Sequence, residues 1–204
     1  MKIKTIQSKT NGSDLIEVEG IVGAQTPAIL PVFEKMIPLF DNIIELGTSK
    51  GALTLLLDHY RKEDSNLTTW ELNPNITDEL VKETPTIDNK LGNVFADNTV
   101  GEIRKLIQQE GRTILLCDGG KKHLEVILYS QYLKPKDVLM CHDYLDDENE
   151  ETLHQANRFQ NEVNWKFASE CTWTMISKHI KKNNLAKWRY EEHKKIMWGS
   201  FIKQ

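Results

Sequence analysis

A loop with two glycines four residues apart has the form of a ligand-binding turn. Gly47 and Gly51 follow a short apolar run, residues 42–46, which contains one acidic residue, Glu45. Glycine allows a backbone to turn sharply and to approach a ligand closely. A helix that starts after such a turn presents free N–H groups to a carboxylate. The spacing therefore predicts that residues 45–51 hold one end of a small ligand.

Two further polar residues lie at or near the ends of later apolar runs, where they could bind the same ligand. Glu71 comes twenty residues after Gly51, near the end of a second apolar run. An acidic side chain at this position can accept hydrogen bonds from both hydroxyls of a ribose. Asn93 lies in the region of a third strand, where its amide could read the amino group of an adenine. Together with the loop, they indicate a site for an adenosyl group.

A second group of candidate residues follows the fourth and fifth apolar runs. Asp118 ends the fourth run, and His142 and Asp143 end the fifth. If the two runs are neighbouring parallel strands, these side chains converge at one edge of the sheet. Two carboxylates and an imidazole can hold a divalent cation such as Mg²⁺, which could lower the pKa of a substrate hydroxyl. In the structural alternative, Asp118 binds the turn amides of Gly119 and Gly120, and the His-Asp pair caps the next segment.

Alternating strands and helices must position these residues. Apolar runs predict strands at 42–46, 67–72, 91–95, 112–117 and 138–141, and helices at 50–60, 76–81, 100–109 and 124–133. Such alternation predicts an α/β fold: a doubly wound, Rossmann-like, mostly parallel sheet with helices on both faces. Residues 165–168 and 173–177 are expected as two strands of a C-terminal antiparallel edge hairpin.

The two ends of the chain are less regular. Residues 1–20 show no clear pattern, and a helix is expected to begin near Leu30 and to end at about Ile37, before Pro38. We therefore expect one domain over 1–204 with an N-terminal helical extension, 1–40. From Lys178 on, eight Lys or Arg residues outnumber two Glu residues, so 180–204 form a basic aromatic tail. The tail could touch an anionic partner, but a solvated helix that packs its aromatic residues on the domain is the simpler interpretation.

Composition limits the class of protein. Of 204 residues, 39% are apolar and 27% charged, which is ordinary for a globular fold. The three cysteines are odd in number and form no metal-binding pattern, so we expect free thiols in a reducing compartment. Because no apolar run approaches the ~20 residues of a membrane span, we expect a cytoplasmic protein without a membrane partner.

The loop at 45–51 resembles the E-x-G-x-G-x-G motif of class I S-adenosylmethionine-dependent methyltransferases, with Ser49 in place of the middle glycine. Residues 23–27, Gly-Ala-Gln-Thr-Pro, and 44–51 resemble the cephalosporin-hydroxylase-like and macrocin-type O-methyltransferase branch. The resemblance covers roughly residues 20–145. It implies that the methionine moiety of the cofactor is surrounded by Glu45, Gly47, Thr48, Ser49 and Gly51, and that the ribose is bound by Glu71. We expect Asn93 and Asp118 to complete the cofactor site.

The same resemblance bears on the catalytic residues. Metal-dependent O-methyltransferases that look similar place acidic ligands at both strand ends, so Asp118, His142 and Asp143 are expected to be both catalytic and metal-binding. The branch usually has a histidine three residues after the first acid, where this chain has Lys121. His142 or Lys121 could act as the general base, since an imidazole is suited to proton removal at neutral pH. His123 lies two positions after Lys121.

The expected function is methyl transfer to a hydroxyl oxygen of a small molecule or sugar. A non-catalytic module that binds S-adenosylmethionine is one alternative. An NAD-linked oxidoreductase is another, which the loop disfavours because it lacks G-x-G-x-x-G. A P-loop is also disfavoured, since Lys50 precedes Gly51. A nucleic-acid acceptor is not expected, because the [DNS]-P-P-[YFW] tetrad that presents a flipped base is absent. A homo-oligomer is left open.

Overall fold

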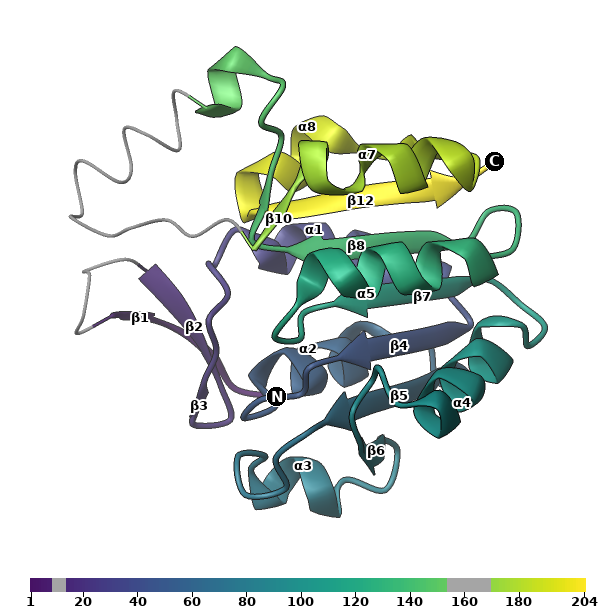
Figure 1. Cartoon of the computed structure of the whole chain (residues 1–204). Coiled ribbons are helices and arrows are strands. Elements are labelled where there is room, and N and C mark those ends of the chain that lie inside the picture. Colours follow the sequence, from purple (N-terminus) through teal and green to yellow (C-terminus); the bar gives the residue numbers. More distant parts are fainter. Residues whose placement is uncertain (9–13, 154–169) are drawn as a thin grey trace.

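A computed structural model describes residues 1–8, 14–153 and 170–204 (Figure 1). The strands of its central seven-stranded sheet are β4 (Asn42–Leu46), β5 (Asn66–Glu71), β6 (Asp88–Leu91), β7 (Thr113–Cys117), β8 (Val138–His142), β11 (Leu185–Lys187) and β12 (Trp198–Lys203). The helices are α1 (Ile29–Met36), α2 (Ala52–Tyr60), α3 (Glu79–Glu83), α4 (Asp97–Ile107), α5 (Lys122–Tyr129), α7 (Trp173–Lys182) and α8 (Tyr190–His193). Short 3₁₀ turns lie at Ile37–Leu39, Ser130–Tyr132 and Lys194–Ile196. Small strands outside the central sheet are β1 (Ile3–Gln7), β2 (Asp14–Val18), β3 (Ile21–Val22), β9 (Tyr144–Leu145) and β10 (Cys171–Thr172).

The strand order, β11-β12-β8-β7-β4-β5-β6, places a reversal of the winding beside β4. From β4 the chain adds β5 and then β6 outward, and it then crosses back to add β7 and β8 on the opposite side. β4 pairs in parallel with both β5 and β7, so Leu46 lies opposite Cys117. Ligands of doubly wound sheets bind beyond the carboxyl ends of the strands at such a reversal. The segments that start at Gly47 and Asp118 therefore lie where a ligand is expected.

Helices cover both faces of the sheet because successive strand residues point to opposite sides (Figure 1). In β4, Ile43 belongs to the apolar cluster that includes α1 and α2, whereas Ile44 belongs to the cluster that includes α4, α5 and α7. All residues of β4 and β7 are buried. Burial on both faces is why parallel strands read as nearly continuous apolar runs.

The predicted fold class is confirmed: the sheet is mostly parallel, with an antiparallel hairpin of β11 and β12 at its edge. β4 has the predicted bounds, and β5, β7 and β8 lie within one residue of theirs. The third strand is an exception, since it covers Asp88–Leu91 and not 91–95. β6 lies at the sheet edge and is largely polar, and beyond it the Asn93 side chain accepts a hydrogen bond from the Phe95 N–H at 3.0 Å, which forms a turn.

The edge hairpin is built from other residues than predicted. Residues 165–168 lie outside the described part of the chain. Residues 173–177, expected as a strand, belong to helix α7, so this prediction is wrong. The buried residues Trp173, Ile176 and Ile180 recur at helical spacing, and the Thr172 hydroxyl accepts a hydrogen bond from the Met175 N–H at the start of the helix. A window of five residues is too short to distinguish the 3.6-residue period of a helix from the two-residue period of a strand.

The N-terminal region is also different from the expectation. Residues 1–20 were expected to lack regular structure, but β1 and β2 form an antiparallel pair, and β3 pairs with β2. The extension 1–40 is therefore part strand and part helix. Helix α1 starts one residue before Leu30 and ends at Met36, as Pro38 predicted.

The basic tail is part of the sheet. Trp198 is only 1% exposed and packs against Phe33, with ring centroids 5.9 Å apart. Trp188 packs edge-on against Phe40 at 6.2 Å. The tail aromatics thus pack on the domain, as the simpler interpretation held, although β11 and β12 replace much of the expected helix. In the described residues, no helix combines the length and apolar character that crossing a membrane requires.

Candidate active site

The turn after β4 requires glycine at two positions. Gly47 has a φ of 100°, and a Cβ atom there would lie 2.5 Å from the carbonyl oxygen of Asp118. Gly51 has a φ of 96°, and its Cβ would lie 2.3 Å from Cγ2 of Val81. Ser49, which replaces the middle glycine of the motif, has a positive φ of 49°, which is unfavourable for most L residues. The predicted cofactor turn therefore packs directly against the backbone that follows β7.

Glu45 lies fully buried at the end of β4. Its Oε2 accepts hydrogen bonds from the hydroxyls of Thr54 and Thr69 at 2.6 and 2.7 Å, whereas Oε1 has no partner in the described structure. Burial raises the pKa of Glu45 to about 8, against the opposing effect of the two threonine hydrogen bonds. The carboxyl is therefore mostly protonated at pH 7, and because Oε2 accepts both hydrogen bonds, the proton belongs on the buried Oε1. Thr48 is held in the same network, since its hydroxyl lies 2.6 Å from that of Thr69.

Glu71, the last residue of β5, contacts the turn, and its binding of a ribose stays a prediction. Its Oε2 accepts a hydrogen bond from the Ser49 N–H at 2.8 Å. Its Oε1 accepts from the N–H groups of Leu72 and Asn73, at 2.8 and 3.0 Å. The neighbouring Leu72 side chain is 68% exposed, so an apolar surface lies next to this carboxylate.

Asn93 lies beyond β6 at the same edge of the sheet. The Gly92 N–H donates a hydrogen bond to the Glu71 carbonyl at 2.9 Å, which fixes this turn beside the end of β5. The Asn93 side chain is exposed, and its oxygen stabilises the turn through the Phe95 N–H. The structure thus places Asn93 near Glu71, and its contact with an adenine stays a prediction.

Asp118, His142 and Asp143 converge, as the adjacent strand ends predicted. Nδ1 of His142 lies 3.0 Å from Oδ1 of Asp118 and 3.5 Å from Oδ2 of Asp143. β7 and β8 pair in parallel up to Cys117 and Cys141, which brings the three residues to one corner. Asp143 has a φ of 53°, an unusual backbone conformation for a residue other than glycine.

Two residues far apart in the sequence orient this corner. Gln25 donates from Nε2 to Oδ2 of Asp118 at 3.3 Å, and its Oε1 accepts from the indole N–H of Trp198 at 3.0 Å. The Trp198 ring also packs against the His142 ring, with centroids 5.0 Å apart. Asp118 and His142 are thus held through partners from the N-terminal segment and from β12.

The Asp118 contact sets the chemistry of the His142 ring. When Nδ1 donates its hydrogen to the carboxylate, Nε2 of the neutral ring carries the lone pair. Burial, the largest influence, would lower the pKa of His142, but the attraction of Asp118 and then of Asp143 outweighs it and raises the pKa above its usual value. Nε2 of His142 is therefore suited to accept a proton.

Lys122, the first residue of α5, supplies positive charge to the corner. Its Nζ lies 3.1 Å from Oδ2 of Asp143 and 3.7 Å from Oδ1 of Asp118, and it donates a hydrogen bond to Glu170. Its side chain is 7% exposed. Burial would lower the pKa of Lys122, but the three carboxylates, Asp118 first, raise it overall. The side chain is therefore a fixed ammonium.

The other two candidate bases, Lys121 and His123, make no hydrogen bond or ion pair with Asp118 or His142 in the described structure. Lys121 is exposed, and its carbonyl oxygen accepts hydrogen bonds from the first turn of α5. Nδ1 of His123 lies 3.1 Å from the carbonyl oxygen of Glu170. Neither contact involves the Asp118–His142 pair.

This arrangement does not fit a resident divalent cation. Asp118 and Asp143, the expected oxygen ligands, both face the Lys122 ammonium. A doubly charged ion ~4 Å from an ammonium would be repelled by about 8 kcal/mol at an effective dielectric constant of ~20, which cancels the attraction of one carboxylate at the same distance. Among the described residues, no three His, Cys, Asp or Glu side chains are grouped so that they could hold a metal ion. The predicted Mg²⁺ thus finds no matching ligand set at Asp118, His142 and Asp143.

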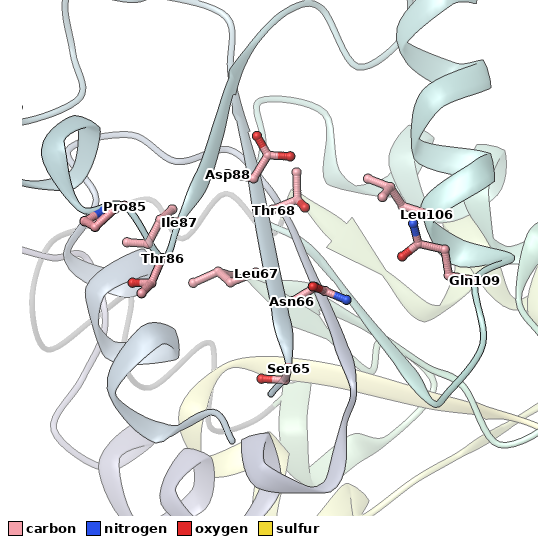
Figure 2. A pocket seen from close by; sticks show the side chains of 10 residues that line it. All are labelled: Ser65, Asn66, Leu67, Thr68, Pro85, Thr86, Ile87, Asp88, Leu106 and Gln109. Atoms are coloured by element: carbon pink, nitrogen blue, oxygen red, sulfur yellow. The ribbon is translucent and has the colours of Figure 1, made fainter. Parts of the chain in front are cut away.

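A separate hollow opens at the other end of the sheet (Figure 2). Its lining includes Ser65 and Asn66 before and at the start of β5, Asp88 at the start of β6, and Gln109 just after α4. These positions lie at the amino ends of parallel strands, away from Asp118. Because ligands of this kind of sheet bind at the carboxyl ends, we place the functional site at the Gly47–Asp118 contact.

Sequence reasoning missed Gln25, Lys122 and Trp198 as site residues. The spacing of apolar residues in α5 could have indicated that Lys122 is buried. The buried face of that helix consists of Lys122, Glu125, Val126 and Tyr129. Charged residues on an otherwise apolar face indicate buried ionic partners. Trp198 had no such signal, because its contact with His142 depends on β12 lying beside β8.

Comparisons with known proteins rest on structure. No protein-family model matches the chain, and no curated protein matches its sequence. Two structures of CmcI, one apo and one with Mg and SAM, each give a TM-score of 0.64 at 12% identity, covering 96% and 97% of this chain and 78% of theirs. A putative caffeoyl-CoA O-methyltransferase from Staphylococcus aureus gives a TM-score of 0.55 at 14% identity, covering 86% of this chain and 83% of that one. The chain therefore has the fold of the class I S-adenosylmethionine-dependent methyltransferases that its turn at residues 45–51 resembles.

Proposed function

We propose that this chain is a methyltransferase that uses S-adenosylmethionine to methylate a hydroxyl oxygen of a small molecule or sugar. One observation carries the proposal: the Gly47 turn contacts Asp118, and Asp118 holds His142. A methyl donor held by the turn would therefore face a corner that offers a base. The fold shared with O-methyltransferases supports this assignment.

The residues around the turn suit the cofactor. We assign the methionine moiety to Glu45, Gly47, Thr48, Ser49 and Gly51, the ribose to Glu71, and the adenine edge to Asn93. The exposed Leu72 side chain supplies an apolar surface for the adenine ring. Asp118 would border the cofactor where the turn packs against it.

The proposed chemistry uses His142 as the base. When bound, S-adenosylmethionine supplies an electrophilic methyl group. Nε2 of His142 would accept the proton of the acceptor hydroxyl as its oxygen takes up that methyl group. Asp118 holds the ring and stabilises the imidazolium that forms. Asp143, 3.5 Å from Nδ1, adds to this stabilisation.

Ligand-dependent stability tests the cofactor. A ligand at 100 times its Kd stabilises the folded state by about 2.7 kcal/mol. Thermal unfolding is expected to shift upward with S-adenosylmethionine and S-adenosylhomocysteine, and not with NAD. The Glu71→Ala variant should reduce the first two shifts. A shift with NAD alone would favour an oxidoreductase and contradict the proposal.

Turnover separates an enzyme from a non-catalytic binding module. S-adenosylhomocysteine formation is measured with a panel of hydroxylated small molecules and sugars for the wild type and for Asp118→Asn, His142→Gln and Lys121→Ala. We expect loss of about 10²–10⁴-fold for His142→Gln, as for a general base, with cofactor binding retained. Lys121→Ala is the matched control, since its side chain is exposed. Unchanged turnover in both site variants would refute the base, and cofactor binding without any turnover would favour the binding module.

The cysteines bear on the compartment. Cys117, Cys141 and Cys171 are all buried free thiols. Free thiols persist in a reducing environment, which supports our proposal of a cytoplasmic location.

A further inference from the structure

Three carboxylates from separate segments surround the Lys122 ammonium. Asp118 follows β7, Asp143 follows β8, and Glu170 precedes β10. Nζ of Lys122 lies 3.1 Å from Asp143 and 3.7 Å from Asp118, and it donates a hydrogen bond to Glu170. An ammonium has three N–H groups, and here three carboxylates face them. Lys122 therefore offsets part of the negative charge of this corner from within the chain.

The position of the ammonium is the one a cation would need in order to use these oxygens. Asp118 and Asp143 are separated by 25 residues in sequence, yet both approach the same Nζ atom. The Lys122 side chain is 7% exposed, so it is packed in place and is not a surface side chain that swings aside.

We propose that Lys122 takes the place of a divalent cation in this site and acts as a positioning residue for Asp118 and Asp143, so that methyl transfer needs no metal. The catalytic meaning of this inference rests on the proposed function. Lys122 holds the acidic corner together, while removal of the acceptor proton falls to His142, which Asp118 orients at 3.0 Å.

Cation binding tests the proposal without cofactor or acceptor. Binding of Mn²⁺ is followed by electron paramagnetic resonance for the full-length wild type, Lys122→Gln, and Lys121→Gln as a matched neighbour. The wild type and Lys121→Gln are expected to bind no Mn²⁺ at millimolar concentration. Lys122→Gln should gain affinity by at least about a hundredfold, because one unit of positive charge has left the carboxylates. Adding Asp143→Asn to Lys122→Gln should abolish the gain.

Two results would overturn the proposal. One is Mn²⁺ binding by the wild type that Asp143→Asn removes, since the ammonium would then not exclude a metal. The other is a folded Lys122→Gln protein that gains no Mn²⁺ affinity. If Lys122→Gln does not fold without metal, Mn²⁺ is expected to restore its near-ultraviolet circular dichroism, and failure to do so also overturns the proposal.

The outcome can be told apart from failure of the proposed function. If the wild type does not bind S-adenosylmethionine, the methyltransferase assignment fails. The Mn²⁺ affinity of the Lys122→Gln variant can still be measured, so the role of Lys122 is tested independently. If the wild type turns over, its rate should be unchanged by EDTA and by added Mg²⁺. A rate that requires Mg²⁺ would contradict the role of Lys122 and leave the methyl transfer intact.

Discussion

Substitution of Gly47 by alanine should damage stability and cofactor binding together. A non-glycine residue with φ of 100° is strained by about 1–2 kcal/mol. The added Cβ would lie 2.5 Å from the Asp118 carbonyl oxygen and 2.8 Å from Cα of Gly119, so backbone must move. Such overpacking typically costs about 1–3 kcal/mol. We therefore expect Gly47→Ala to lower the free energy of unfolding by about 2–5 kcal/mol.

Two other glycines provide matched controls. Gly120 lies in the adjacent loop and Gly101 inside helix α4, and a Cβ added at either would meet no atom within 4 Å. Gly120→Ala should be nearly neutral, and Gly101→Ala should stabilise by about 0.5–1 kcal/mol, as alanine does in a helix. Urea unfolding followed by circular dichroism gives the free energies, and calorimetry with S-adenosylmethionine gives the affinity. If Gly47→Ala is no less stable than Gly120→Ala, the close approach of the two loops is refuted.

Three further predictions concern buried charge and the exposed edge of the site. Burial lowers the pKa of His193 to about 4 from 6.5, so the unfolded state binds a proton first and stability is lost as pH falls from about 6.5 to 4, by about 3 kcal/mol. Urea unfolding at several pH values should show this loss reduced in His193→Asn, and an equal loss in both proteins would contradict it. Since the pKa of Glu45 is about 8, Glu45→Gln should lower the free energy of unfolding by less than about 1 kcal/mol at pH 7. Glu45→Ala should lower it by about 2–4 kcal/mol, because the Thr54 and Thr69 hydroxyls lose their acceptor. Similar unfolding midpoints for the two variants would count against this. Leu72→Asp should weaken cofactor binding at least about tenfold by calorimetry with little change in stability, because this exposed side chain contributes little to the core; unchanged affinity would remove Leu72 from the adenine site.

The central strands could be predicted because burial on both faces leaves a continuous apolar run. β4 was predicted at its observed bounds for this reason, and β7 to within one residue. β6 could not be predicted, since it lies at the sheet edge, where polar residues are tolerated. The N-terminal strands could not be predicted either, since they form a separate small sheet in which β1 and β2 mix apolar and polar residues. The segment 173–177 was misassigned because helix and strand look alike in a short apolar window, and its amphipathic period emerges only when Ile180 is included.

The residues of the site also fall into those that the sequence could predict and those that it could not. Asp118 and His142 could be expected to meet because adjacent parallel strands bring their ends together, and they lie 3.0 Å apart. The period of α5 indicates that Lys122 is buried, but its three carboxylate partners could not be assigned, since they come from segments whose proximity depends on the whole fold. The same holds for Gln25, whose two hydrogen-bond partners are 93 and 173 residues away along the chain.

That last separation has a consequence for how the protein reaches its native state. The Gln25–Trp198 hydrogen bond joins positions 173 residues apart, and contacts of such high sequence separation are slow to form during folding. The corner around His142 is thus assembled only after β12 has docked beside β8. After dilution from denaturant, recovery of ligand binding should follow the slowest refolding phase, while helical signal returns earlier.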